Sequence, residues 1–210
     1  MKELKLIPPN DPRVNNAIAP FVDEMLEENG FKDRKELAEA MNFTMEKYQG
    51  IGLSANQVGL PFNMFVVGGH PQIENGMRLS CFNPMIIESS EETIMMKEGC
   101  LTYPFLFLNI KRPRKITLKY TDEDGELKEA KLDGMMSRIV QHEYDHMLGR
   151  NFTEKASKLK IDAAMKKRDK MLKRMKKYQE AEAKLNKAWH FLNNQVGYTL
   201  WVIRGIKKWQ

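Results

Sequence analysis

Long hydrophobic runs are absent from this 210-residue sequence, and none approaches the roughly 20 apolar residues that a membrane-spanning helix needs. The first residues, MKELKLIPPNDP, also lack the apolar stretch and the small-residue cleavage site of a secretory signal peptide. These absences argue against a membrane-spanning or secreted protein, and we expect a cytoplasmic one.

Cysteine is scarce too, with only Cys81 and Cys100 in the chain. Two residues cannot form a disulfide framework, so in a reducing compartment each is expected to be a small buried side chain or a metal ligand. Cys81, in the β-rich run RLSCFNP, fits the first description. Cys100 lies in KEGCLTYP, where a loop before a proline could present a thiolate.

Charge is present in quantity but is unevenly distributed. Residues 1–153 hold 18 Lys/Arg against 23 Asp/Glu, whereas residues 154–210 hold 16 against 5. We therefore expect a catalytic domain over residues 1–153 and a basic extension over residues 154–210. A basic extension indicates either a polyanionic partner or a well-solvated amphipathic helix.

The spacing of apolar residues predicts an α+β fold in which antiparallel strands pack around one later helix, followed by a long C-terminal helix. Helical spacing predicts helices at 14–29, 33–49 and 134–148, and a basic helix from about residue 155 to a break at Gly197. Short β-rich runs predict strands near 63–69 and 78–87, and alternation around Asp124-Gly125 predicts a hairpin over 115–134. The apolar end of the chain, 197–210, is expected to dock on another surface.

The strongest chemical signal is QHEYDHMLG at residues 141–149, within the third of these predicted helices. His142 and His146 lie one turn apart on one face, so both imidazoles can reach one cation, with Glu143 beside it. Two histidines can also fall at this spacing by chance, so a third ligand is needed. A metalloprotease of the HExxHxxGxxH type would have histidine at position 152, but Phe152 stands there.

No acid downstream completes the site convincingly, because residues 155–179 contain only Asp162 and Asp169. Upstream, Cys100 is the natural candidate. With EGCLT at 98–102 and GIGLSANQ at 50–57, the QHEYDHMLG stretch completes a set of three motifs. In order and approximate separation they resemble the motifs of the peptide deformylases, a resemblance that covers about residues 7–153.

The resemblance implies a metallohydrolase that removes the formyl group from the N-terminal formylmethionine of nascent polypeptides. It implies one divalent metal ion bound by Cys100, His142 and His146, with Glu143 as general base and acid. The Gln57 side-chain amide and the backbone N–H of Leu101 would stabilise the oxyanion.

The resemblance also implies that the substrate backbone pairs as an added strand with Ile51 and Gly52 on one side and Gly99 on the other. Ferrous iron is implied as the working metal. Two imidazoles and a thiolate equally suit Zn(II), Ni(II) or Co(II), so the ligands alone do not select the metal.

Several positions depart from the family pattern or lie close to the motifs. Ser54 stands where the first motif usually has alanine, and Thr102 stands where the second usually has serine. Arg138, one turn before His142, is expected to be a solvated side chain. Glu98 is expected to hold a neighbouring group rather than to act on the substrate.

Two histidines are given no ligand role. His70 in GGHPQ is expected to be a surface residue, and His190 could reach the site only if the basic extension folded back.

Alternatives from different classes remain open at this point. Within enzymes, the HExxH pattern allows a zinc metallopeptidase, for which Cys100 need not bind metal. Outside enzymes, the basic extension allows an RNA-binding protein with an accidental HExxH. The extension itself either docks on ribosomal RNA or packs its apolar face on the domain or on a second subunit.

Overall fold

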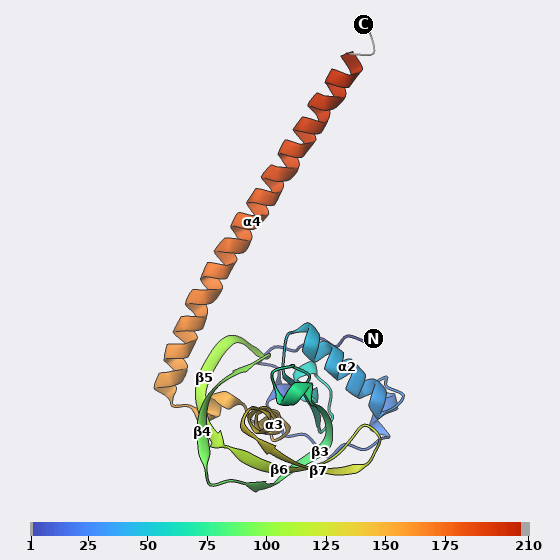
Figure 1. The fold of residues 1–210 in the computed structure, drawn as a ribbon, viewed down its shortest axis with the longest axis vertical. Coiled ribbons are helices and arrows are strands. Elements are labelled where there is room, and N and C mark those ends of the chain that lie inside the picture. Colours follow the sequence, from blue (N-terminus) through green and yellow to red (C-terminus); the bar gives the residue numbers. More distant parts are fainter. Residues whose placement is uncertain (1, 207–210) are drawn as a thin grey trace. The chain divides into compact units, whose positions relative to one another are not determined.

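The structure is a computed structural model that describes the backbone of residues 2–206 and the side chains of residues 2–187. Internal contacts divide the chain into two units, Met1–Ala164 and Met165–Gln210, which are described separately. Among the described residues, no helix is long and apolar enough to cross a membrane. The predicted α+β class, with antiparallel strands around a helix and a C-terminal helix, is confirmed (Figure 1).

The N-terminal segment differs from its predicted structure. In place of a helix over 14–29 there are only the 3-10 helix η1 (Pro12–Val14) and the single-turn α1 (Met25–Glu28). Pro20 lacks an N–H and disfavours helical backbone in the residue before it. The helix predicted from apolar spacing is therefore wrong here. The segment is extended instead, and Ile18 donates its N–H to the carbonyl of Met147.

Helix α2 (Arg34–Lys47) forms as predicted. The Asp33 side chain accepts a hydrogen bond from the N–H of Glu36, so an orphan amide of the first turn is satisfied. Its apolar face, including Leu37, Met41 and Met45, is fully buried in a cluster that also contains several phenylalanines.

Five antiparallel strands form the main sheet in the order β1-β2-β3-β6-β7. Their bounds are β1 Gly52–Ser54, β2 Met64–Gly68, β3 Arg78–Ser89, β6 Lys115–Thr121 and β7 Leu127–Asp133. The predicted hairpin is confirmed: β6 and β7 pair in continuous register, and Gly125 adopts the positive φ that its turn requires. Short 3-10 helices connect other strands, namely η2 (Ala55–Val58) and η3 (Glu74–Gly76).

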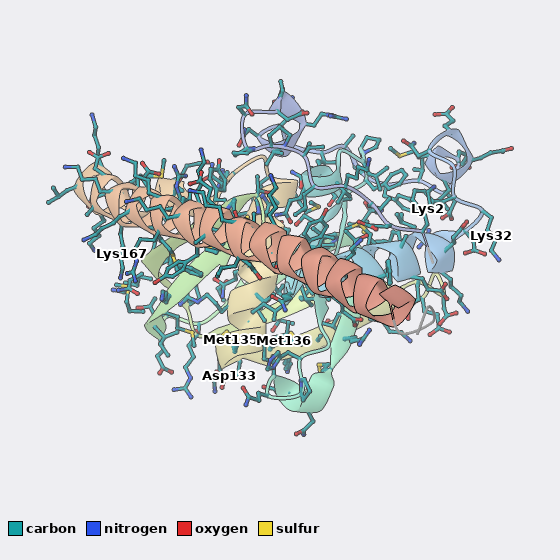
Figure 2. The ribbon with its side chains drawn as sticks, turned by 90° about the horizontal axis from the view of Figure 1, so that it is seen from above. Lys2, Lys32, Asp133, Met135, Met136 and Lys167 are labelled. Carbon is teal, nitrogen blue, oxygen red and sulfur yellow. The ribbon has the colours of Figure 1, made fainter. Side chains whose placement is uncertain are left out.

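Strands β4 (Thr93–Cys100) and β5 (Tyr103–Pro113) form a separate two-stranded hairpin. Helix α3 (Gly134–Met147) begins directly after β7, with Asp133 at its N-terminus (Figure 2). Figure 1 shows α3 enclosed by the β4–β5 hairpin and the main sheet. The helix packs Met136, Ile139 and Val140 against the apolar face of that sheet.

After η4 (Phe152–Lys155), helix α4 runs from Lys158 to Ile206. The helix continues through Gly197, so the predicted break there is wrong. One glycine costs a helix only about 1 kcal/mol relative to alanine, which a long helix can absorb. Described side chains of α4 such as Lys167 are charged and project from the helix (Figure 2). The side chains of 197–210, which were expected to dock on another surface, lie outside the described ones.

Candidate metal centre and active site

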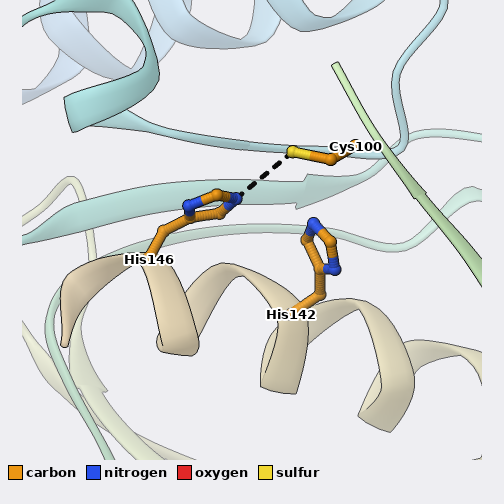
Figure 3. Close-up of side chains that lie close together, drawn as sticks. All are labelled: Cys100, His142 and His146. Atoms are coloured by element: carbon orange, nitrogen blue, oxygen red, sulfur yellow. Dashed lines mark hydrogen bonds between the residues drawn. The ribbon is translucent and has the colours of Figure 1, made fainter. Parts of the chain in front are cut away.

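The three predicted metal ligands come together from two elements. Cys100 is the last residue of β4, and His142 and His146 lie one turn apart on α3. Their ligand atoms all lie within 4.8 Å of one another, and the Cys100 Sγ is 3.4 Å from the His146 Nε2 (Figure 3). A thiolate and two imidazoles form a donor set that suits a transition-metal ion and leaves one position open, so these residues fit the metal that the motifs imply.

The ring of His142 is held from two sides. Its Nδ1 lies 3.0 Å from the Glu98 Oε2, which leaves Nε2 to face the cluster. A carboxylate on the far nitrogen orients an imidazole ligand and raises its basicity. Phe152 packs against the same ring, with centroids 5.5 Å apart. Phe152 stands where an HExxHxxGxxH protease has its third histidine, and here it packs on the ring of a proposed ligand.

Glu98 also anchors a buried network of charged side chains. Arg112, on β5, donates to both carboxylate oxygens of Glu98 and, at 2.6 Å, to the Oδ2 of Asp145 on α3. Arg138 donates to the Glu98 Oε1 at 2.7 Å and to backbone carbonyls of β4 and β5. These contacts join the hairpin to α3, and each charge in the network has an opposite partner.

The interpretation of Arg138 as a solvated side chain is therefore wrong, since the residue is only 3% exposed. Its position one turn before His142 places it on the face of α3 that meets the hairpin. Arg112 was not among the predicted site residues, although the sequence holds a signal for its burial: Leu106, Leu108, Ile110 and Arg112 alternate on the buried face of β5.

The pKa values follow from this packing. Burial alone would raise the pKa of Glu98, but hydrogen bonds from His142 and Arg112 hold it well below its usual range. Burial also opposes ionisation of the Cys100 thiol, yet the neighbouring His146 and His142 lower its pKa well below the ordinary value. In His142, burial is outweighed by the Cys100 sulfur and Glu98, which raise the pKa to about 10. The cluster by itself thus favours a Cys100 thiolate beside a protonated His142, and a metal bound there would take the place of the imidazole proton.

Glu143 is buried beside the ligands on α3. Burial raises its pKa, and the two imidazoles and a hydrogen bond from Ser54 offset this only in part. The Ser54 Oγ lies 2.5 Å from the Glu143 Oε2. Ser54 had been noted in the sequence only as a departure from alanine, because nothing in the linear pattern places it against a residue 89 positions away.

Gln57 lies on η2 with its amide directed at the cluster. Its Oε1 accepts from the N–H of Ser54 at 2.8 Å, which orients the amide nitrogen. That Nε2 lies 3.3 Å from the Cys100 Sγ and 3.0 Å from the Thr102 Oγ1. Leu101 follows Cys100 directly, in the turn between β4 and β5. The two donors expected to act on an oxyanion thus flank the same ligand.

The expected substrate contacts come from two segments next to the centre. Gly52 begins β1, and Ile51 precedes it, half-buried. A Cβ on Gly52 would lie 2.4 Å from the Glu143 Oε1, and one on Gly50 would lie 2.7 Å from the Leu101 Cδ1. Gly99, on β4, is exposed. A larger residue at either glycine would therefore have to displace the end of the Glu143 or Leu101 side chain.

Other residues weighed as ligands are absent from the cluster. Cys81 is fully buried in the apolar core between the main sheet and α3, and burial raises the pKa of its thiol. His70 is exposed in the loop after β2. The side chain of His190 lies outside the described ones.

Comparison with known proteins adds the decisive observation: residues 12–162 match the model of the polypeptide deformylase family. The chain belongs to this family. Curated deformylases are similar over most of their length. The Mesorhizobium japonicum enzyme is 39% identical to this chain, and the match covers 66% of this chain and 79% of that enzyme. The enzyme of Wolbachia sp. subsp. Brugia malayi is 37% identical, and the match covers 76% of this chain and 96% of that enzyme.

Solved deformylase structures share the fold. The enzyme of Ehrlichia chaffeensis superimposes with a TM-score of 0.70 at 31% identity, covering 82% of this chain and 98% of its own. That of Thermotoga maritima gives a TM-score of 0.65 at 32% identity, covering 75% and 99%. Deformylases are metalloenzymes, in agreement with the Cys100, His142 and His146 cluster. The alternative of a zinc metallopeptidase is not supported.

Proposed function

We propose that this deformylase removes the formyl group from N-formylmethionyl peptides at a centre formed by Cys100, His142, His146 and Glu143. The observation that carries the proposal is the convergence of a β4 sulfur and two α3 imidazoles within 4.8 Å, with a buried carboxylate on the same helix. The net reaction is hydrolysis of one amide bond: water and the formyl peptide give formate and a free N-terminal amine.

Cys100, His142 and His146 would hold one divalent ion, and we propose ferrous iron as the ion used in the cell. The ion would act as a Lewis acid and lower the pKa of water towards about 7. Zinc and nickel suit the same ligands, so the protein is expected to bind them as well.

Glu143 would move the proton. Its Oε1 faces the backbone of Gly52, where the substrate strand is expected, and it can take a proton from the attacking water. The same carboxyl can then protonate the leaving amine. Burial raises the pKa of this carboxyl above its ordinary value, which favours its second role as a proton donor.

Gln57 and Leu101 would stabilise the negative charge that develops on the formyl oxygen. The Gln57 amide is held by Ser54 before substrate arrives, so no reorientation is needed during the reaction. Each donor aimed at developing charge contributes about 3 kcal/mol in well-studied cases.

The peptide would bind as an added strand. Among the described residues, β1 pairs only with β2, and β4 pairs only with β5, so each has an edge available for an extended peptide. Ile51 and Gly52 would contact its backbone from the β1 side and Gly99 from the β4 side.

A formate-release assay on a formyl-Met peptide tests this assignment. The parent protein, loaded with iron without oxygen, should release formate, and Glu143→Ala should lose about 10²–10⁴-fold in kcat because the proton shuttle is removed. Glu126→Ala, an exposed glutamate on the β6–β7 turn, is the matched control and should equal the parent. Absence of formate from the iron-loaded parent would overturn the assignment.

We further propose that the basic helix α4 contacts ribosomal RNA, where formylated nascent chains emerge. Its described part carries closely spaced basic residues with exposed side chains, including Lys173, Arg174, Lys176 and Lys177. Such charges bind phosphates with an affinity that falls steeply with salt. The alternative is that apolar residues at helical spacing, such as Leu172 and Leu185, pack on a protein surface.

Neutralising these four residues to glutamine separates the two possibilities. Under RNA binding, co-sedimentation with ribosomes should weaken and its salt dependence should flatten, while formate release from free peptides stays unchanged. Four exposed lysines on β5, β6 and β7 provide the matched control, namely Lys111, Lys115, Lys119 and Lys131. Equal ribosome binding by the two fourfold variants would exclude the RNA contact.

A further inference from the structure

We infer that the Ser54 hydroxyl is a positioning group for the general base: it holds Oε2 of Glu143 and leaves Oε1 as the oxygen that moves the proton. The inference rests on the proposed role of Glu143. It assigns a function to the residue at which this chain departs from the alanine usual in the first motif.

The contact has the geometry of a strong, shielded hydrogen bond. Ser54 is fully buried and Glu143 is 4% exposed, and the Oγ to Oε2 distance of 2.5 Å is typical of a hydroxyl donating to a carboxylate. A hydroxyl can both donate and accept, so it keeps this bond whichever of the two atoms carries the proton. Its second possible acceptor, the Glu143 carbonyl, is more distant at 3.3 Å.

No other described side chain hydrogen-bonds the Glu143 carboxylate. The free oxygen, Oε1, points at Gly52, where even a single added carbon would lie 2.4 Å away. The carboxylate is thus fixed from one side by Ser54 and directed from the other towards the edge of β1. Without the hydroxyl, rotation about the last side-chain bond of Glu143 would have no polar restraint.

The backbone of Ser54 makes the restraint rigid. Ser54 pairs with Phe65 on β2, so its Cα is fixed by the main sheet. Its N–H donates to the Gln57 Oε1, so one residue orients the proton shuttle with its side chain and the proposed oxyanion donor with its backbone. Substitution of Ser54 removes the first contact and retains the second.

Steady-state kinetics of the iron-loaded enzyme on a formyl-Met peptide test the inference. In Ser54→Ala we expect kcat to fall about three- to ten-fold, because part of the 10²–10⁴-fold contribution of a placed base is lost. KM and bound iron should stay within two-fold of the parent. Ser137→Ala removes another fully buried hydroxyl on α3, bonded to Gln141, and should keep the parental kcat.

A second pair of variants separates the hydroxyl from packing. Ser54→Thr and Ser54→Val have nearly the same shape and differ in the hydroxyl, so any effect of overpacking is shared. The Thr variant should exceed the Val variant in kcat by at least three-fold. This pair also tests the inference if Ser54→Ala does not fold.

Coupling to Glu143 provides the last readout. In a Glu143→Gln background, Ser54→Ala should change the residual rate by less than two-fold, because the group that it positions is already disabled. The inference is overturned if Ser54→Ala keeps a parental kcat, if Thr and Val variants are equal, or if Ser54→Ala has the same effect in both backgrounds. In each of these cases the proposed function still stands if the parent releases formate and Glu143→Ala does not.

Discussion

The two sides of helix α3 are held by opposite kinds of interaction. Towards the main sheet, Met136, Ile139 and Val140 are buried among apolar side chains. Towards the β4–β5 hairpin, Arg138 and Asp145 are equally buried but form ion pairs and hydrogen bonds. The two proposed histidine ligands, His142 and His146, lie on this helix, which is thus stabilised from one side and oriented from the other.

The difference shows how stability and geometry are divided in this protein. Apolar contacts are non-directional, and they tolerate small shifts of the helix. Charged hydrogen bonds require fixed distances and angles, so the network around Glu98 specifies where His142 sits relative to Cys100. Changes on the charged side should therefore affect the metal, and changes on the apolar side should affect unfolding alone.

The largest effect is expected from the hairpin ligand itself. Cys100→Ala should abolish stoichiometric iron or zinc binding and reduce formate release by more than about 10³-fold, because two imidazoles alone are a weak site. Metal content by elemental analysis measures this directly. Cys81→Ala, in the apolar core, should keep its metal; similar metal contents in the two variants would refute the role of Cys100.

The next effect tests the charged side. Arg112→Met leaves the carboxylates of Glu98 and Asp145 short of a buried partner, and should lower the free energy of unfolding by about 3–5 kcal/mol. Metal affinity should fall about 10–100-fold because Glu98 no longer orients His142 firmly. Arg114→Met is the control, since that arginine also bonds two carboxylates but is exposed. Unchanged metal affinity in Arg112→Met would break the proposed division.

A substitution on the apolar side should separate stability from chemistry. Leu118 is fully buried on β6, in the cluster against which α3 packs. Leu118→Ala should lower the free energy of unfolding by about 3 kcal/mol. The kcat and metal content of the folded variant should stay within two-fold of the parent. Leu127→Ala, 70% exposed on β7, should leave both quantities and stability unchanged. A loss of metal in Leu118→Ala would contradict the comparison.

A smaller, pH-dependent effect is expected at Tyr120 in the same apolar cluster. Burial, together with the nearby Cys81, Asp122 and Glu123, raises the pKa of Tyr120 to about 12. Because the folded pKa exceeds the unfolded value of about 10, stability that depends on the neutral phenol is complete below pH 10 and is lost as the pH rises towards 12. In urea unfolding of the metal-free protein, the free energy of unfolding of Tyr120→Phe relative to the parent should rise above pH 10. A constant difference from pH 8 to pH 11 would contradict this.

The smallest effect is expected on α4. Lys173 is exposed there, and Lys173→Gln should change the free energy of unfolding by less than about 0.5 kcal/mol, without effect on metal content or kcat. Thermal unfolding and the formate assay measure both. A change as large as that of Arg112→Met would show that charge on α4 serves the same purpose as charge beside α3.

Much of the site could be predicted because its signals are local. The spacing of His142 and His146 reports one helix face, and the cap at Asp33 and the turn at Gly125 follow from backbone chemistry. The three short motifs predict the family and the activity, the spacing of apolar residues predicts the α+β fold, and all three predictions are confirmed. The ligand and substrate roles of individual residues stay predictions, supported by the distances between them.

The features that were missed depend on tertiary contacts. Burial of Arg138 requires Glu98 and two hairpin carbonyls, none of which its neighbours in sequence reveal. The contact between Ser54 and Glu143 likewise joins a sheet to a distant helix. Near the N-terminus, apolar spacing suggested a helix, but Pro20 and pairing with the end of α3 favoured extended backbone.

The glycine at position 52 has a consequence for drug resistance. An enzyme can escape a competitive inhibitor by enlarging a residue that the inhibitor contacts, but here a larger residue would first displace the carboxylate of Glu143. Because Glu143 is the proposed general base, we expect escape through this position to reduce turnover along with inhibitor binding. Inhibitors that lie against the Gly52 backbone therefore address a point at which the protein has little freedom to evolve.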